Sequence, residues 1–255
     1  MLAGSLLQQC YNIADTLIVG QCIGANALAA VGSAYTLMVF LISILLGLSM
    51  GSGTVFSLQY GAGDLSALRR SIYVSFLLIG TVTILLNVAV FLWLDPILRW
   101  LQVPYDIYSL MRNYLWIIFW GIVFTFLYNF YAALLRAVGD SVTPLWFLAV
   151  SVVLNIGLDL FLILVLDQGI EGAAVATVIA QGTAASGILL YTYKIRPELR
   201  LHREDMRFDR SSLREITSFS TLTCVQQSVM NFGILMVQGL VTVSYTHLRA
   251  HETPE

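Results

Sequence analysis

The segment YNIADTLIVG (residues 11–20) places Asp15 among apolar residues, and the next 48 residues, Thr16 to Gly63, contain no Asp, Glu, Lys or Arg. The whole chain of 255 residues is 58% hydrophobic and 11% charged, with a mean hydropathy of +0.82. Soluble domains carry about 25% charged residues. The composition therefore predicts a membrane protein, and it lacks the basic footprint that nucleic-acid binding requires.

Seven apolar stretches are long enough to cross a membrane, since a spanning helix needs roughly 20 apolar residues. They are residues 1–20, 34–59, 71–94, 113–135, 144–166, 172–193 and 216–243. Their apolar character is continuous and does not alternate, which excludes a β-barrel. The sequence thus predicts an all-α membrane protein, with a polar linker at 194–215 between the sixth and seventh spans.

Basic residues gather in the loops on one side of the predicted membrane. Three loops hold ten of them: Arg69, Arg70, Arg136, Lys194, Arg196, Arg200, Arg203, Arg207, Arg210 and Arg214. The opposite side holds Arg99 and Arg112. The positive-inside rule places the ten, the linker and the N-terminus in the cytoplasm. For the linker we expect a solvated connector, and the alternative is an amphipathic, lipid-bound helix.

Both ends of the chain look incomplete. The first span begins at residue 1 without a flanking loop, so we expect the true start to be missing. The last residues, SYTHLRAHETPE (244–255), fit no membrane pattern and resemble a translated sequencing adaptor joined to a truncated gene. We expect this tail not to be native; the alternative is a short polar tail.

Two acidic residues, Asp15 and Asp159, lie well inside predicted spans. A charged aspartate at a helix centre costs about 2.5–3.5 kcal/mol on insertion scales. No Lys or Arg lies in the middle of any span to offset it. Two readings remain: the carboxyls are protonated, or a cation such as Na⁺ lies between them. Either reading makes the pair an ion or proton site.

Polar neighbours strengthen this reading. Asn155 and Asp159 are spaced i and i+4, so they share one helix face. An amide oxygen one turn from a carboxylate suits a hard cation or a proton network. Tyr11 precedes Asp15 by the same spacing and can donate a hydrogen bond to it. Thr177 lies near the middle of the sixth span, where the alternative role is a hydroxyl bonded to its own helix.

Four motifs carry a specific resemblance. They are YNIADTLIVGQCIGANALAAVG (11–32), GAGDLSALRR (61–70), LLRAVGDSVTP (134–144) and NIGLDLFLILVLDQGIEGAAVATVIAQ (155–181). In this order and spacing they resemble the multidrug and toxic compound extrusion (MATE) family over about residues 1–242. That fold has twelve helices in two six-helix lobes with a substrate cavity between them. The resemblance implies that residues 1–193 are the first lobe and 216–243 the first helix of the second lobe.

The resemblance also implies roles for individual residues. In the branch similar to DNA-damage-inducible and archaeal members, a first-lobe cation site would comprise Asp15, Asn155, Asp159 and Thr177, with Tyr11 in the same network. Tyr114 and Asn129 match positions that line the first-lobe cavity; ordinary packing between helices is the alternative. The chain departs from the family at SFSTLTCVQQSV (218–229), where Thr221 or a neighbour replaces a usual proline.

Other functional classes fit the sequence less well. The GAGD and AVGD motifs (61–64 and 137–140) are similar to those of intramembrane aspartyl proteases, but Asp64 and Asp140 fall in loops, where turns and helix caps are expected. No enzyme is therefore predicted. A channel would not need a two-lobe duplication. A flippase for lipid-linked oligosaccharides or other amphiphilic lipids is the serious rival, although such proteins usually carry central basic residues.

The predicted function is that of a secondary-active antiporter in a bacterial or archaeal plasma membrane. It would export organic cations or amphiphilic drugs in exchange for H⁺ or Na⁺, with no cofactor. The expected metal sites are limited to possible Na⁺ binding at Asp15, Asn155, Asp159 and Thr177. Its expected partners are the small-molecule substrate, the lipid bilayer and the second lobe of the same chain, with no nucleic acid.

Overall fold

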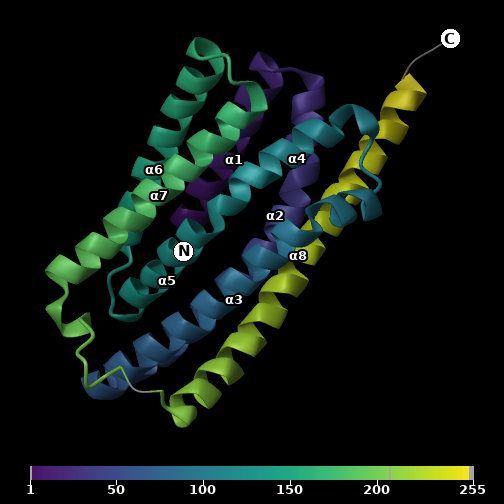
Figure 1. Ribbon diagram of the computed structural model, residues 1–255. Coiled ribbons are helices and arrows are strands. Elements are labelled where there is room, and N and C mark those ends of the chain that lie inside the picture. The colour runs from purple at the N-terminus through teal and green to yellow at the C-terminus, as the bar shows by residue number, and fades with distance from the viewer. Residues whose placement is uncertain (1, 207, 253–255) are drawn as a thin grey trace.

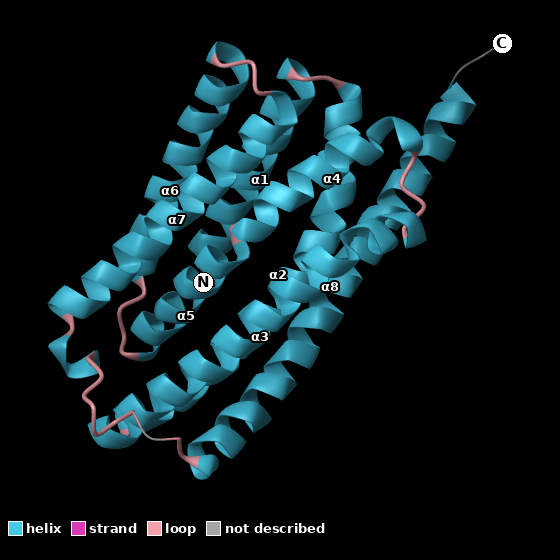
Figure 2. Ribbon diagram, in the orientation of Figure 1, coloured by secondary structure: helices cyan, strands magenta, loops and turns pink. Residues whose placement is uncertain are grey.

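The chain forms a bundle of long helices (Figures 1 and 2). The computed structural model describes the backbone of residues 2–206 and 208–252, and the side chains of residues 7, 13–206, 208–230 and 233. The helices are α1 (Leu2–Cys22), α2 (Ala25–Gly61), α3 (Leu65–Trp100), α4 (Tyr105–Trp120), α5 (Ile122–Ala137), α6 (Val142–Leu160), the π-turn η1 (Phe161–Val165), α7 (Gly169–Ile195), the 3₁₀ turn η2 (Pro197–Leu199) and α8 (Arg210–Glu252). Within the described residues no strand is present, as the composition predicts.

Each predicted span coincides with a helix or a pair of consecutive helices. In the described part of the chain four helices are long and apolar enough to cross a membrane, and α4 with α5 makes a fifth span if the bent pair is counted as one. The predicted stretch at 216–243 lies within α8, which begins at Arg210, inside the predicted linker 194–215. The non-helical connection is correspondingly shorter than predicted.

The fourth span differs from the single helix predicted at 113–135. It is broken at Gly121 into α4 and α5, whose axes are bent by 45°. Gly121 donates its N–H to the Ile118 carbonyl, 2.8 Å away, in the tighter i to i−3 pattern. A glycine inside an apolar run is weak evidence for a break, which explains why the hydrophobic pattern alone does not predict it.

The helices are arranged so that α1 packs against α6, and α6 against α7, at one side of the bundle (Figure 1). The central helix α2 contacts α3, α4, α5 and α8. Aromatic rings fill the space between α2, α3 and α5, where Phe130 lies 6.0 Å from Phe56 and 5.4 Å from Phe76, centroid to centroid. The connections α2–α3, α5–α6 and α7–α8 lie at one end of the bundle, which we call the linker end (Figure 2).

The closest helix contact is between α2 and α8. A Cβ atom on Gly51 would lie 2.4 Å from Cα of Ser220, and one on Gly47 would lie 2.6 Å from Cα of Cys224. The Ser220 hydroxyl donates to the Leu48 carbonyl across this contact, at 3.2 Å. Small residues four apart allow the backbones of two membrane helices to approach each other closely. Gly47 and Gly51 therefore permit the close packing of α8 against α2.

Ion pairs close the linker end. Arg69 at the start of α3 donates to Asp205 at 2.8 Å, and Arg196 lies 3.5 Å from Asp140. Partial burial raises the pKa of Asp140, but hydrogen bonds from Thr143 and the charge of Arg196 outweigh it and hold that pKa below its usual value. The connection between α7 and α8 is thus tied to the helices on either side of it.

The aspartates of the GAGD and AVGD motifs cap the N-terminal ends of helices, as predicted. Asp64 is the N-cap of α3 and accepts a hydrogen bond from the Ala67 N–H at 2.9 Å. Asp140 accepts from the N–H and the hydroxyl of Thr143 in the first turn of α6. Both carboxylates satisfy N–H groups that a helix start leaves without partners. Neither is placed for proteolysis inside a membrane.

Candidate cation site

Three helices bring the predicted polar residues together in the interior of the bundle. Asp15 comes from α1, Asn155 and Asp159 from α6, and Thr177 from α7. Asn155 and Asp159 are fully buried, Thr177 is 3% exposed and Asp15 is 7% exposed. Carboxyl and amide groups are expensive to bury, so the burial of these side chains from three helices makes this region the candidate site.

The spacing of the two polar residues in α6 places both of them on the same face of the helix. Asn155 and Asp159 are one helical turn apart on the buried face. Directly after Asp159 the helix widens into the π-turn η1, in which the Leu166 N–H donates to the Phe161 carbonyl at 3.2 Å. Such π-turns are rare and occur often at functional sites.

Small residues on α7 let α6 approach it closely. Ala173, Ala176, Ala180 and Ala184 recur along the buried face of α7, each at most 4% exposed. At Gly187 of α7 a Cβ atom would lie 2.5 Å from the ring of Phe147 on α6, so the two helices are in close contact there. Between the same two helices Asn155 donates from Nδ2 to the Thr177 hydroxyl oxygen, over 3.4 Å.

Four oxygen atoms of the site have no hydrogen-bond partner in the described part of the chain. The carboxyls of Asp15 and Asp159 lie within hydrogen-bonding reach of each other. Within the described residues, Asp15 Oδ1, both carboxyl oxygens of Asp159 and Asn155 Oδ1 are buried and have no hydrogen-bond partner. A hydrogen bond between two carboxyls needs a proton on one of them. Positive charge at these oxygens, as a proton or as a cation, would offset the cost of burying them.

No basic side chain supplies that charge. Across the described part of the chain, the ion pairs within 4 Å involve Asp95, Asp140, Glu198 and Asp205 as acids, and neither Asp15 nor Asp159. Carboxylate and carbonyl oxygens are the ligands that hard cations prefer. The arrangement can hold a proton between the two carboxyls or a small hard cation among the oxygens.

The other predicted site residues lie elsewhere or cannot be placed. Tyr11 belongs to α1, but its side chain lies outside the described residues. Tyr114 is 4% exposed and belongs to the hydrophobic core. Asn129 is half-buried on α5 and donates to the Thr125 carbonyl, one turn earlier, at 2.8 Å. Whether Tyr114 and Asn129 line a substrate cavity stays a prediction.

One polar residue near the site was not predicted. Gln181 lies one turn beyond Thr177 on α7 and accepts a hydrogen bond from the Thr125 hydroxyl of α5, at 3.0 Å. Its signal in the sequence is an amide in the middle of the apolar stretch 172–193. An amide in a membrane span needs a hydrogen-bond partner on another helix. That requirement could have identified Gln181 as a residue that bonds between helices.

Comparisons with known proteins agree with this architecture. The profile of the MatE family matches residues 1–161. The probable multidrug resistance protein YpnP of Bacillus subtilis is 37% identical over 194 residues, 76% of this chain and 44% of that protein. The probable multidrug resistance protein YoeA of the same organism is 33% identical over 252 residues, 97% of this chain and 52% of that protein.

A solved structure shares the fold. A transporter of the MOP superfamily from Pyrococcus furiosus superposes with a TM-score of 0.85 at 23% identity, covering 92% of this chain and 52% of that one. The chain spans about half the length of the curated relatives it matches. The bundle is therefore a recurring unit that is found inside a larger membrane protein.

Proposed function

Since this chain belongs to the MatE family of multi-pass membrane transporters, we propose that it forms the ion-coupling lobe of an antiporter. The antiporter exchanges H⁺ or Na⁺ for organic cations or amphiphilic drugs. The relatives' names, which refer to multidrug resistance, support the drug as cargo. The substrate cavity would lie between this lobe and a second lobe that begins with α8.

One observation carries the proposal. Three carboxyl oxygens, one of Asp15 and two of Asp159, and the amide oxygen of Asn155 are buried without hydrogen-bond partners in the described part of the chain. A buried polar oxygen without a partner costs about 1–3 kcal/mol, and more if it is charged. A purely structural site would have evolved donors for these oxygens. A site that binds and releases a cation must leave them open.

The coupling would work through α1. With the site empty, two carboxylates in reach of each other repel, and α1 is held less firmly on α6. A bound proton or cation removes the repulsion and favours close packing of the two helices. The ion thereby shifts the equilibrium between two packings of α1, and a drug that prefers the other packing is released. The coupling is reciprocal, so drug binding must weaken ion binding by the same factor.

We place the linker end in the cytoplasm, in a bacterial or archaeal plasma membrane. The support is the positive-inside rule, since nine of the ten basic residues noted above, all but Arg207, which lies outside the described residues, belong to connections or helix ends at the linker end. Arg112, on the other side, pairs with Asp95 at 2.8 Å, which leaves little net charge there. The inward gradient of H⁺ or Na⁺ would then drive export.

The decisive test uses a two-lobe transporter whose first lobe is this chain, reconstituted in liposomes. Efflux of a cationic dye is measured under an imposed pH gradient and then under a Na⁺ gradient. We expect one gradient to drive efflux, and Asp15→Asn or Asp159→Asn to abolish it. Asp167→Asn is the matched control, because Asp167 is an exposed loop residue at φ 51°, a conformation that asparagine tolerates.

Two results would contradict the proposal. Efflux that persists in both Asp15→Asn and Asp159→Asn would show that the pair does not couple the ion. No dye movement under either gradient, with correctly inserted protein, would favour the flippase function instead. Flipping of a fluorescent lipid-linked oligosaccharide would then be measured in the same liposomes.

A further inference from the structure

The break in the fourth span interrupts the regular helix inside the bundle, because α4 ends at Trp120 and α5 begins at Ile122. At this point the Gly121 N–H donates to the Ile118 carbonyl at 2.8 Å, and the Thr125 N–H donates to the Gly121 carbonyl at 3.0 Å. In a membrane interior, backbone groups that a broken helix frees require other partners.

Side chains from two other helices supply partners. Asn87 of α3 donates from Nδ2 to the Phe119 carbonyl at 2.8 Å. On the other side, the Thr125 hydroxyl lies 3.2 Å from the Gly121 carbonyl and 3.0 Å from Oε1 of Gln181 on α7. The bend is therefore held from α3 and from α7 at once, and not by α4 and α5 alone.

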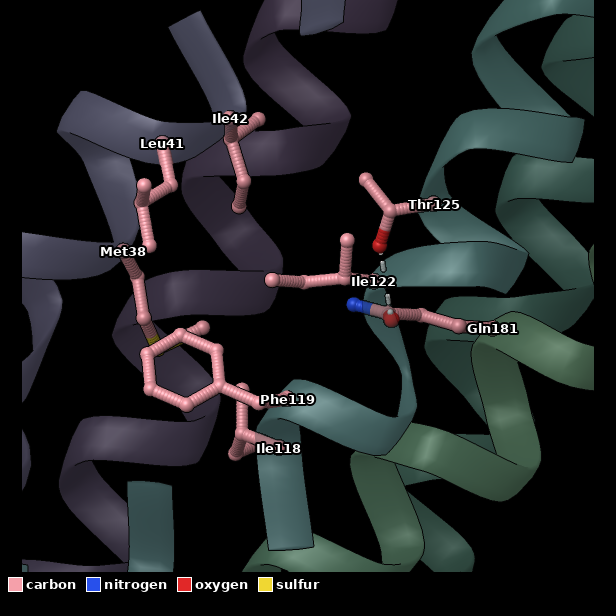
Figure 3. Close-up of a pocket in the computed structure, with 8 residues that line it drawn as sticks. All are labelled: Met38, Leu41, Ile42, Ile118, Phe119, Ile122, Thr125 and Gln181. Carbon is pink, nitrogen blue, oxygen red and sulfur yellow. Dashed lines mark hydrogen bonds between the residues drawn. The ribbon is translucent and has the colours of Figure 1, made fainter. Parts of the chain in front are cut away.

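Contact between the break and α7 is tight. A Cβ atom on Gly121 would lie 3.1 Å from both Gln181 Oε1 and Val178 Cγ2. On the opposite side lies a small pocket, whose lining from α2 is Met38, Leu41 and Ile42 (Figure 3). Figure 3 shows Gln181 reaching from α7 toward this pocket, with the Thr125 bond beside it. A shift of α7 at Gln181 would therefore press on the break.

The same helix carries the cation site. Thr177 and Gln181 are one turn apart on α7. Thr177 is bonded to Asn155 of the site, and Gln181 to Thr125 at the break. A helical turn is stiff, so displacement of one side chain displaces the other. This is a contiguous chain of bonded groups between a binding site and a bendable element.

We propose that Gln181 is a positioning residue that transmits cation occupancy at the Asp15–Asp159 pair to the bend at Gly121, through its hydrogen bond with Thr125. The proposal rests on the cation site of the proposed function. In this proposal the fourth span contains a hinge at Gly121 whose angle is controlled by contacts with α7. This hinge movement would accompany the movement of α1. In the cation-bound state the bond holds the hinge; when the site empties, the bond loosens and the bend changes.

The test uses this chain in lipid nanodiscs. Cation binding is followed with radiolabelled sodium and, without sodium, by proton uptake on acidification. Hydrogen exchange of amides 119–125 is measured with and without the cation, with choline chloride as the ionic-strength control. We expect the cation to slow this exchange at least about fivefold, the lower end of typical coupling between sites.

Matched variants separate coupling from folding. Thr125→Val and Gln181→Met keep the shape of each side chain and remove the bond between them, whereas Thr125→Ser keeps the hydroxyl. We expect the first two variants to bind the cation as the original chain does, with the exchange response lost. We expect Thr125→Ser to retain both. Thr183→Val, whose hydroxyl bonds only its own helix at Ile179, should leave binding and response unchanged.

Each outcome decides between the two proposals. Cation binding without any change in exchange at 119–125 would overturn the hinge and leave the cation site standing. A response that persists in both Thr125→Val and Gln181→Met would also overturn the hinge. If the original chain takes up neither sodium nor protons at the aspartate pair, the proposed function fails, and the hinge coupling fails with it.

Discussion

Asn155 on α6 donates a hydrogen bond from Nδ2 to the Thr177 hydroxyl oxygen on α7, and 3.4 Å separates the two atoms. The bond uses one N–H of the amide, and Asn155 Oδ1 is buried without a hydrogen-bond partner among the described residues. Asn155 thereby adds an acceptor oxygen to the two carboxyls. In the proposed cation site, this group of acceptors favours a proton or a cation over an anion.

Removal of the Thr177 hydroxyl should weaken the cation site. Thr177→Val keeps the side-chain shape but leaves Asn155 Nδ2 without its acceptor, so the amide is no longer held. A lost buried hydrogen bond of about 1.4 kcal/mol corresponds to a tenfold higher Kd. Radiolabelled sodium binding in nanodiscs measures the change, and Thr177→Ser should restore it. Equal affinity in Thr177→Val would exclude Thr177 from the site.

Neutralising Asp159 should make the protein more stable and insensitive to sodium. Asp159→Asn replaces a buried carboxylate by an amide of the same shape, which removes the repulsion with Asp15. We expect a higher Tm than the original chain in sodium-free buffer at alkaline pH. Sodium at 100 times its Kd should stabilise the original chain by about 2.7 kcal/mol and the variant not at all.

Thermal unfolding in sodium and in choline chloride makes this comparison. Asp167→Asn serves as control, since the Asp167 carboxylate is exposed in the loop after η1 and is not among the buried oxygens of the site, and it should keep the sodium effect. A sodium-dependent Tm in Asp159→Asn would place the cation somewhere else.

A methyl group on Gly51 should separate α8 from α2. Its Cβ would lie 2.4 Å from the Ser220 backbone, a distance that forces the helices apart. Overpacking of this kind costs about 1–3 kcal/mol. The matched control is Gly32→Ala in the same helix, where a Cβ meets nothing within 4 Å. There alanine should be neutral or stabilise by up to about 1 kcal/mol. Thermal unfolding measures both, and equal effects would contradict the contact.

The linker end should loosen in acid. Burial raises the pKa of Asp205, but the His202 N–H and the charge of Arg69 outweigh it and lower that pKa from 3.8. A carboxylate whose pKa is lower in the folded state than in the unfolded state stabilises the folded state. This stabilisation is complete at a pH above the unfolded-state pKa and is lost as the pH falls through the folded-state pKa. The contact should therefore persist at neutral pH and fail only below the ordinary aspartate pKa.

Hydrogen exchange of the His202 amide reports this loss, because that N–H donates to Asp205 Oδ2 at 3.1 Å. After correction for the intrinsic rate, protection should fall in acid in the original chain. Asp205→Asn should show low protection at every pH. Protection that falls already near neutral pH would contradict the assignment.

Much of the fold follows from the sequence because lipid imposes one requirement on every span. Backbone groups must bond within the segment, so a run of about 20 apolar residues predicts a helix at each of the seven stretches. The buried aspartates were predictable for the same reason, since a carboxyl in a span is costly and has to be used. Asn155 and Thr177 followed from helical spacing and from the family resemblance, and the structure brings both to Asp159.

The break at Gly121 and the close contact of α8 with α2 could not be predicted from hydrophobic runs. Both depend on what faces a glycine from another helix: Gln181 at the break, and Ser220 and Cys224 at the α2–α8 contact. Hydrophobic runs carry no information about such neighbours. Two sequence signals could have predicted such contacts between helices. They are the spacing Gly47-xxx-Gly51 and the isolated amides Asn87 and Gln181.

The packing of α1 against α6 also has a consequence for biogenesis. During synthesis Asp15 enters the membrane long before Asp159 exists, because the two lie 144 positions apart (159 minus 15). At about 5–20 residues per second, the first helix waits roughly 10 s for its partner. Throughout that interval the insertion machinery must accommodate a lone aspartate within an apolar helix. The nascent chain is then most exposed to quality-control proteases, and a slow codon between α1 and α6 would lengthen that exposure.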